Sequence, residues 1–102
     1  MKSAARRPPQ SDFGRALRVA RKAKGFPQES FDQVSSRTYI SSLERGLKQP
    51  TVAKVDELAA VLGVHPLTLL ALSYLRHPTP VSVQKLAAHL IEEIDELNLV
   101  AR

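Results

Sequence analysis

The sequence predicts an all-α fold, and three observations lead to that prediction. Apolar residues recur at intervals of three and four along most of the chain, a spacing that puts them on one face of a helix. Aromatic residues make up only 5% of the chain, so Leu, Val, Ile and Ala must fill the core, which favours helices over a β-sandwich. No two segments of alternating apolar and polar residues are joined by a tight turn, so the chain lacks the sequence pattern of a β-hairpin.

The first helix is predicted to begin after residue 11. Ser11 can cap it by accepting a backbone N–H. Phe13, Leu17 and Ala20 follow at i, i+4 and i+7 and form an inward stripe. Gly25 ends the helix, because glycine tolerates the left-handed conformation that follows many helix C-termini.

A second, short helix is predicted from Gln28 to Val34, and a third from residue 36 to residue 45. Ser35-Ser36 interrupts the apolar pattern, and a serine there can cap the third helix. Gly46 ends that helix. The residues of these two helices that we expect to face the core are Phe31, Val34, Ile40 and Leu43.

Two further helices are predicted in residues 51–75. Thr51 can cap the fourth helix, and Gly63 can end it. Pro66 begins the fifth, since the missing N–H of a proline costs nothing at the first position of a helix. The residues that we expect to be buried are Val52, Val55, Leu58, Ala59 and Leu62 in the fourth helix, and Leu67, Leu70, Ala71, Tyr74 and Leu75 in the fifth.

A sixth helix is predicted from Pro80 to about Asn98, with Thr79 as its cap. Its apolar positions are Val83, Leu86, Ala87, Leu90, Ile94 and Leu97, and its acidic ones are Glu92, Glu93, Asp95 and Glu96. The chain thus divides into a disordered basic arm at residues 1–10, a helical domain at residues 11–76 and a C-terminal helical segment at residues 77–102.

Basic residues are concentrated in the first half of the chain. Residues 1–50 carry 11 Lys and Arg against 4 Asp and Glu, whereas residues 51–102 carry 4 against 6. Lys and Arg that neutralise phosphates release counterions, which is the main non-specific driving force for DNA binding. A solvated basic surface without a ligand is the alternative, since charge reports on association and not on fold.

The composition argues against several classes of protein. Cysteine is absent, so neither a disulfide nor a thiolate metal site can form. The chain has no Gly-rich phosphate loop and no His-Glu pair with metal-ligand spacing, so we expect no enzymatic activity, cofactor or metal. No apolar run is long enough to span a membrane, and the N-terminus lacks the apolar core of a secretory signal. We therefore expect a cytoplasmic, nucleoid-associated protein.

Residues 28–50 carry the pattern of a helix-turn-helix. Two short helical segments flank a small polar turn, and the second segment ends at Glu44-Arg45-Gly46. We predict that one outer face of this helix is shared by Arg37, Thr38, Ser42 and Arg45. Such a face presents hydrogen-bonding side chains to the major groove of DNA.

These residues, with others on either side, resemble the XRE-like (Cro/phage-repressor-type) helix-turn-helix family of DNA-binding proteins. The resemblance implies a five-helix repressor-type domain from about Phe13 to Leu75, in which the third helix enters the major groove. The predicted sixth helix lies outside the resemblance. The matching residues are Leu17, Arg21, Gly25, Gln28-Glu29, Phe31, Ile40-Ser41, Leu43-Glu44-Arg45-Gly46, Pro50-Thr51, Leu58-Ala59, Leu62-Gly63-Val64 and Leu69-Leu70.

The resemblance also implies which side chains contact double-stranded DNA. Arg37, Thr38 and Ser42 are the candidates for base edges, because arginine can grip guanine O6 and N7 with two donors and threonine can bond a base edge. For Tyr39, packing against the first helix is the favoured alternative to a phosphate contact. The candidates for phosphate contacts are Gln28, Ser36, Tyr39, Arg45, Lys48 and Gln49.

Arg21 and Glu44 match positions that form an ion pair between the first and third helices in relatives, which would orient the third helix without reading bases. The segment from Gln28 to Ile40 is shorter than the family pattern, so the second helix or the turn must be tighter. Asp32 stands where relatives carry a small core residue, and its carboxylate must face water or a partner because unpaired burial is costly.

The predicted sixth helix allows three interpretations. Its apolar face can fold back on the domain, bind another protein, or pair with its copy in a homodimer through Leu86, Leu90, Ile94 and Leu97. The leading hypothesis is a sequence-specific transcription regulator, a dimeric repressor that binds two half-sites of DNA. The alternative is an antitoxin or another protein-interaction module in which DNA binding serves autoregulation.

Overall fold

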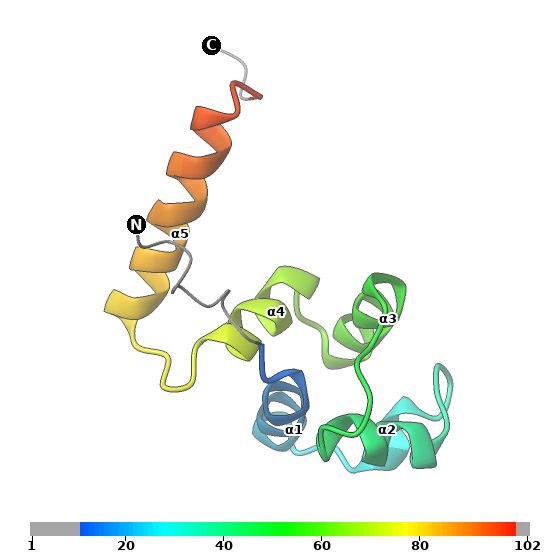
Figure 1. Cartoon of the computed structure of the whole chain (residues 1–102). Coiled ribbons are helices and arrows are strands. Elements are labelled where there is room, and N and C mark those ends of the chain that lie inside the picture. Colours follow the sequence, from blue (N-terminus) through cyan, green and yellow to red (C-terminus); the bar gives the residue numbers. More distant parts are fainter. Residues whose placement is uncertain (1–10, 100–102) are drawn as a thin grey trace.

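The computed structural model describes residues 11–99 and confirms the all-α prediction, because within that range the chain forms helices and no β-strand (Figure 1). The predicted basic arm at residues 1–10 lies outside the described residues. In chain order the elements are α1 (Phe13–Ala23), the 3₁₀-helix η2 (Gln28–Phe31), α2 (Arg37–Glu44), α3 (Val52–Leu62), α4 (Pro66–Tyr74) and α5 (Pro80–Glu96).

Side-chain caps determine where the α-helices begin. Thr51 and Thr79 cap α3 and α5 as predicted, and Ser36 caps α2. The prediction for α1 is wrong, because Asp12 and not Ser11 accepts the backbone N–H of the first turn. A carboxylate at this position also interacts favourably with the partial positive charge of a helix N-terminus.

The predicted second helix, Gln28–Val34, is wrong in type and length. Only Gln28–Phe31 is helical, as a four-residue 3₁₀ turn, so the described chain has five α-helices where six helices were predicted. The preceding Pro27 makes no side-chain hydrogen bond that would cap this turn. The shortened segment is thus accommodated by a tighter helix, and Asp32, which follows it, is exposed as predicted.

The turn between η2 and α2 is fastened to α3 by one lysine. Lys54 Nζ donates a hydrogen bond of 2.5 Å to the backbone carbonyl of Val34. The same ammonium lies 5.9 Å from the centroid of the Tyr39 ring, within the range of a cation–π contact. The Lys54 ammonium also lies 2.7 Å from the carboxylate of Glu57, one turn further along α3, and this ion pair helps to hold the lysine in position.

The core lies between α1, α2, α3 and α4, with Phe31 contributed by η2. Helix α1 crosses α2 at very short range, because a Cβ added to Gly14 would lie only 2.3 Å from the carbonyl oxygen of Leu43. Only glycine therefore fits at this crossing. The buried apolar residues are Phe13, Ala16, Leu17, Phe31, Ile40, Leu43, Val55, Leu58, Ala59, Leu62 and Leu69.

Three of the residues predicted to be buried in α3 and α4 are exposed instead: Val52, Leu67 and Tyr74. In α4 the buried positions are Leu69 and Ser73. Residues Pro66–Tyr74 are apolar on nearly every side, so the spacing alone did not identify the face that meets α1 and α3.

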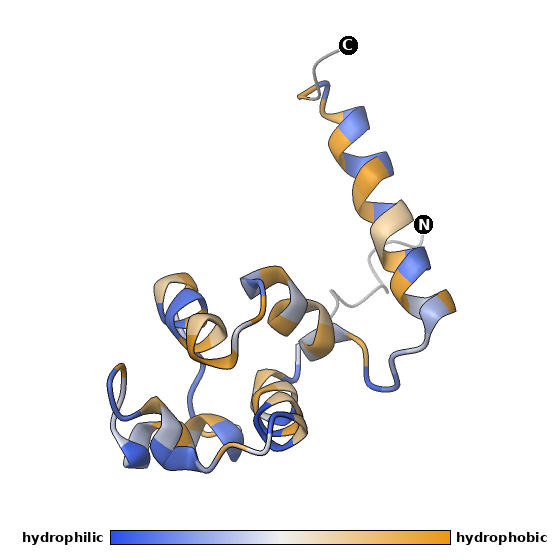
Figure 2. Ribbon diagram, turned by 180° about the vertical axis from the view of Figure 1, so that it is seen from behind, coloured by the Kyte–Doolittle hydropathy of each residue, from blue (hydrophilic) through white to orange (hydrophobic). Residues whose placement is uncertain are grey.

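Helix α5 projects away from the helical domain, and none of its residues is buried (Figure 1). The interpretation in which this helix folds back on the core is therefore wrong. Apolar and polar residues alternate along its surface (Figure 2). In the part of the chain that the structure describes, no single helix is long and apolar enough to cross a membrane; α3 and α4 together meet that test only as a pair bent by 106°.

Candidate nucleic-acid interface

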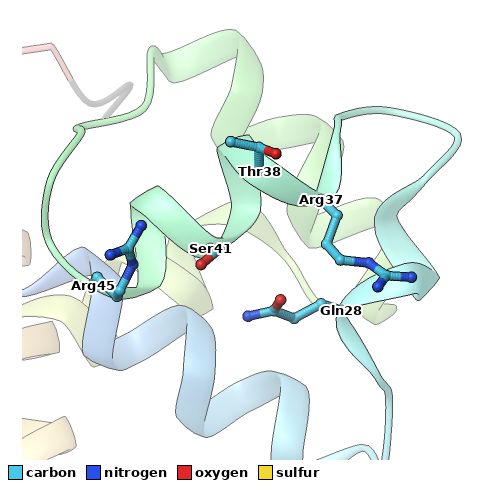
Figure 3. Close-up of a pocket in the computed structure, with 5 residues that line it drawn as sticks. All are labelled: Gln28, Arg37, Thr38, Ser41 and Arg45. Atoms are coloured by element: carbon cyan, nitrogen blue, oxygen red, sulfur yellow. The ribbon is translucent and has the colours of Figure 1, made fainter.

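Helix α2 is held in the core along one side and open to solvent along the other. Ile40 and Leu43 are fully buried and anchor the inner side. The opposite side forms an open pocket of about 360 Å³ with η2, and Arg37 and Arg45 stand at its two ends (Figure 3). The lining residues are Gln28, Arg37, Thr38, Ser41 and Arg45.

Two of the three predicted base-contacting residues are accessible. Arg37 and Thr38 are exposed at the first turn of α2. Ser42 is only 7% exposed and lies toward the protein interior, so the structure corrects its assignment to base contact. Its neighbour Ser41 lines the pocket in its place. Both are serines, and the only sequence feature that separates them is their position relative to the buried Ile40 and Leu43.

The predicted ion pair between Arg21 of α1 and Glu44 of α2 is present. Arg21 donates from Nε to Glu44 Oε2 at 2.7 Å and from Nη2 to Oε1 at 2.9 Å, in the two-point geometry that gives Arg–carboxylate pairs their strength. Burial acts to raise the pKa of Glu44, but the hydrogen bonds from Arg21 and Gln28, together with the positive charges of Arg21 and Arg18, hold that pKa below its ordinary value. The hydrogen bonds that Arg21 donates to Glu44 raise the pKa of Arg21.

Further hydrogen bonds join α1, the end of α2 and the segment that includes η2. Arg18 Nη2 donates to the backbone carbonyl of Glu44 at 3.0 Å, and Arg21 Nη1 donates to the carbonyl of Phe26 at 2.9 Å. Gln28 Nε2 donates to Glu44 Oε1 at 3.1 Å, so the amide of Gln28 is held at the edge of the pocket. One buried carboxylate thus fixes the angle of α2 and the position of Gln28.

The other predicted phosphate-contacting residues differ in how free they are. Arg45, Lys48 and Gln49 are exposed at and beyond the end of α2. Ser36 is exposed, but its hydroxyl already accepts the N–H of Tyr39 at 3.1 Å. Tyr39 itself is half-buried against the core, and its ring lies beside Lys54 of α3.

An acidic partner of Arg37 was not predicted from the sequence. Glu29 Oε2, on η2, lies 2.6 Å from Arg37 Nη2 on α2. The two residues are separated by a tight turn and not by one helical turn, so no helical spacing in the sequence indicates the contact. Arg37, the first candidate for base contact, is therefore already paired in the free protein.

The predicted dimerisation residues lie on α5 or, for Leu97, directly after it. Helix α5 is on the far side of the domain from α2 (Figure 1). Leu90, Ile94 and Leu97 are exposed and Leu86 is half-buried. Between α5 and α4 lies an open, mainly apolar groove of about 500 Å³. Its lining residues are Leu67, Leu70, Ala71, Tyr74, Leu86, His89, Leu90 and Glu93.

Comparison with known proteins gives a family for this arrangement. Residues 17–69, slightly more than half of the 102, match the Helix-turn-helix family. The chain is 50% identical over 46 residues to an uncharacterized HTH-type transcriptional regulator, y4dJ, of Sinorhizobium fredii (strain NBRC 101917 / NGR234). That match spans 43% of this chain and only 60% of the relative's length.

Two solved structures are similar over larger shares of their length. The restriction-modification controller protein C.AhdI from Aeromonas hydrophila is 33% identical, with a TM-score of 0.54 over 58% of this chain and 92% of its own. The hypothetical transcription factor NHTF from Neisseria is 27% identical, with a TM-score of 0.57 over 78% of this chain and 85% of its own. Because the family match covers more than half of the residues, the chain belongs to the XRE-like helix-turn-helix family.

Proposed function

We propose that this protein is a transcription repressor that binds duplex DNA by inserting α2 into the major groove. The observation that carries the proposal is the outer face of α2, where Arg37, Thr38, Ser41 and Arg45 line one open surface of a helix that is anchored in the core on its other side. The major groove admits an α-helix, and the exposed side chains of that helix can reach base edges. The proposed activity is binding, with no chemical step.

Within this proposal the first turn of α2 reads sequence. Arg37 grips a guanine through O6 and N7, and Thr38 and Ser41 bond base edges or touch a thymine methyl. The remaining polar side chains at the margin fix the protein on the backbone, which supplies affinity and orientation without sequence information. These are Gln28, Arg45, Lys48 and Gln49.

We further propose that two copies bind together. The apolar face of α5 and the groove beside α4 expose Leu67, Tyr74, Leu90 and Ile94 to water, and a second copy would cover them. The net charge of residues 51–102 is negative, so this side of the protein is unsuited to phosphate contact. A symmetric pair would read two half-sites about 34–36 Å apart.

Selection of duplexes from a random DNA pool, followed by affinity measurements at two salt concentrations, tests the proposal. Arg37→Ala should weaken binding to the selected sequence by about 1–3 kcal/mol, or about 5- to 150-fold, and should change binding to random DNA little. Lys48→Ala should weaken both DNAs alike and reduce the salt slope by about one.

The outcomes separate base reading from phosphate attraction. Equal weakening of selected and random DNA by Arg37→Ala contradicts base reading by Arg37. A wild-type protein that enriches no sequence from the pool contradicts sequence-specific binding altogether.

Sedimentation of Leu90→Glu, with Ala88→Glu as the matched control on α5, tests the second copy. Wild type and Ala88→Glu should be dimers at the concentrations at which they bind DNA, whereas Leu90→Glu should be a monomer with weaker binding to paired half-sites. A wild-type monomer on the DNA would contradict the dimer and leave the α5 face to another protein, the alternative raised by the sequence.

A further inference from the structure

The pair between Glu29 and Arg37 lies at the edge of the proposed DNA interface. Glu29 Oε2 approaches Arg37 Nη2 to 2.6 Å, and the two side chains remain 49% and 59% exposed. Ion pairs this exposed contribute little to folding stability. Its place beside the recognition surface therefore points to a role in binding and not in the fold.

The geometry of the pair leaves Arg37 able to read a base. A guanidinium carries five N–H donors in a rigid fork, and the contact to Glu29 is made through Nη2. Two donors are needed for guanine O6 and N7, so one carboxylate contact does not exhaust the fork. In Figure 3 the guanidinium of Arg37 reaches from α2 toward η2. Glu29, which pairs with it, belongs to η2.

The charge of Glu29 acts against contacts with the DNA backbone. Glu29 follows Gln28, a proposed phosphate contact, and any phosphate that approaches Arg37 also approaches this carboxylate. Like charges brought together at an interface cost affinity and suppress the wrong partner. An arginine that is already neutralised also releases fewer counterions on non-specific DNA.

We propose that Glu29 is a specificity-determining positioning residue, which orients the Arg37 guanidinium toward a guanine edge and withholds its charge from phosphates. This inference rests on the proposed function, because it assigns a role in the discrimination between specific and random DNA. Removing the carboxylate should affect the two DNAs in opposite directions. Affinity for the specific site should fall, because the Arg37 guanidinium is no longer oriented toward the guanine. Affinity for random DNA should rise, because the positive charge of Arg37 becomes available to phosphates.

The test compares Glu29→Gln with Asp32→Asn on the selected duplex and on a random duplex of equal length, at two salt concentrations. Asp32 is an exposed acidic residue of the same segment that makes no ion pair within residues 11–99, so its substitution controls for the loss of one negative charge. Glu29→Gln should reduce the ratio of specific to random affinity about 5-fold or more. Its binding to random DNA should tighten, with a salt slope steeper by about one. Asp32→Asn should leave the ratio unchanged.

The same comparison in an Arg37→Ala background tests whether Glu29 acts through Arg37. There Glu29→Gln should change the ratio no more than Asp32→Asn does. Equal effects of the two substitutions in the wild-type background, or a ratio that rises with Glu29→Gln, would overturn the inference. If wild type itself selects no sequence, the proposed function fails; if it selects one and Glu29→Gln keeps the ratio, only the role of Glu29 fails. Thermal unfolding of each variant confirms that the fold is kept.

Discussion

Leucines recur at the same helical spacing in the domain and in α5, yet their environments are opposite. Leu17, Leu43 and Leu58 are fully buried, whereas Leu90 and Leu97 are 46% and 64% exposed. The difference arises from where the preceding turn directs each helix, since α5 leaves the domain and packs little against it. Spacing therefore identifies an apolar face, but it does not identify what covers that face.

The largest expected difference in stability is between shortening a leucine of the core and shortening a leucine of α5. Leu58→Ala should lower the free energy of unfolding by about 3 kcal/mol, because it removes buried methyl groups and leaves a cavity. Leu90→Ala should change it by less than about 0.5 kcal/mol at protein concentrations where the chain is monomeric. Chemical denaturation at two protein concentrations measures both. A concentration-independent loss for Leu90→Ala as large as that for Leu58→Ala would contradict the comparison.

A smaller effect is expected from adding one methyl group. Gly14→Ala would gain about 1 kcal/mol from helix propensity alone. The new Cβ would meet the backbone oxygen of Leu43 at 2.3 Å, and overpacking against backbone should instead destabilise the domain by about 2 kcal/mol.

Ala88→Leu is the matched control on α5, where the site is open to solvent and the change should be within about 0.5 kcal/mol. Thermal unfolding gives the sign for both variants. A stabilised Gly14→Ala protein would mean that α1 and α2 can separate without cost.

The smallest effect is expected from acid. The folded-state pKa of Glu44 is lowered, so its contribution to stability is present above its ordinary value of 4.5 and is lost as the pH falls from there through the folded pKa. The free energy of unfolding of wild type should therefore fall more steeply below pH 4.5 than that of Glu44→Gln. Glu93→Gln, in the exposed pair of α5, is the matched control for the loss of one carboxylate. Parallel profiles for wild type and Glu44→Gln would contradict this role of the Arg21–Glu44 pair.

Much of the fold could be predicted because its helix ends have local chemical causes. Thr51, Thr79 and Pro66 begin helices where the sequence predicted, and Gly25 and Gly63 adopt the left-handed conformation past helix ends. The short segment before α2 predicted that the second helix or the turn would be tighter, but it did not determine which of the two, so the 3₁₀ form of η2 was not predicted. The buried face of α4 could not be predicted either, since that helix is apolar on nearly every side.

The candidate interface was predictable to a similar extent. The exposure of Arg37 and Thr38 follows from the buried positions of Ile40 and Leu43 on the same helix. Whether Ser41 or Ser42 faces the pocket depends on the rotation of α2 about its axis, and that rotation is determined by the packing of α2 against α1. The contact between Glu29 and Arg37 depends on the path of the turn that joins η2 to α2, and no local pattern encodes that path.

The close crossing at Gly14, with Arg18 and Arg21 bonded to Glu44, joins α1 and α2 into one rigid body. The helix proposed to enter the major groove is fixed in this way and cannot pivot to follow an irregular duplex. We expect any mismatch in shape to be absorbed by the nucleic acid, through bending at flexible pyrimidine–purine steps. The DNA sequences that the protein prefers should then also depend on how easily the duplex bends at base pairs that no side chain touches.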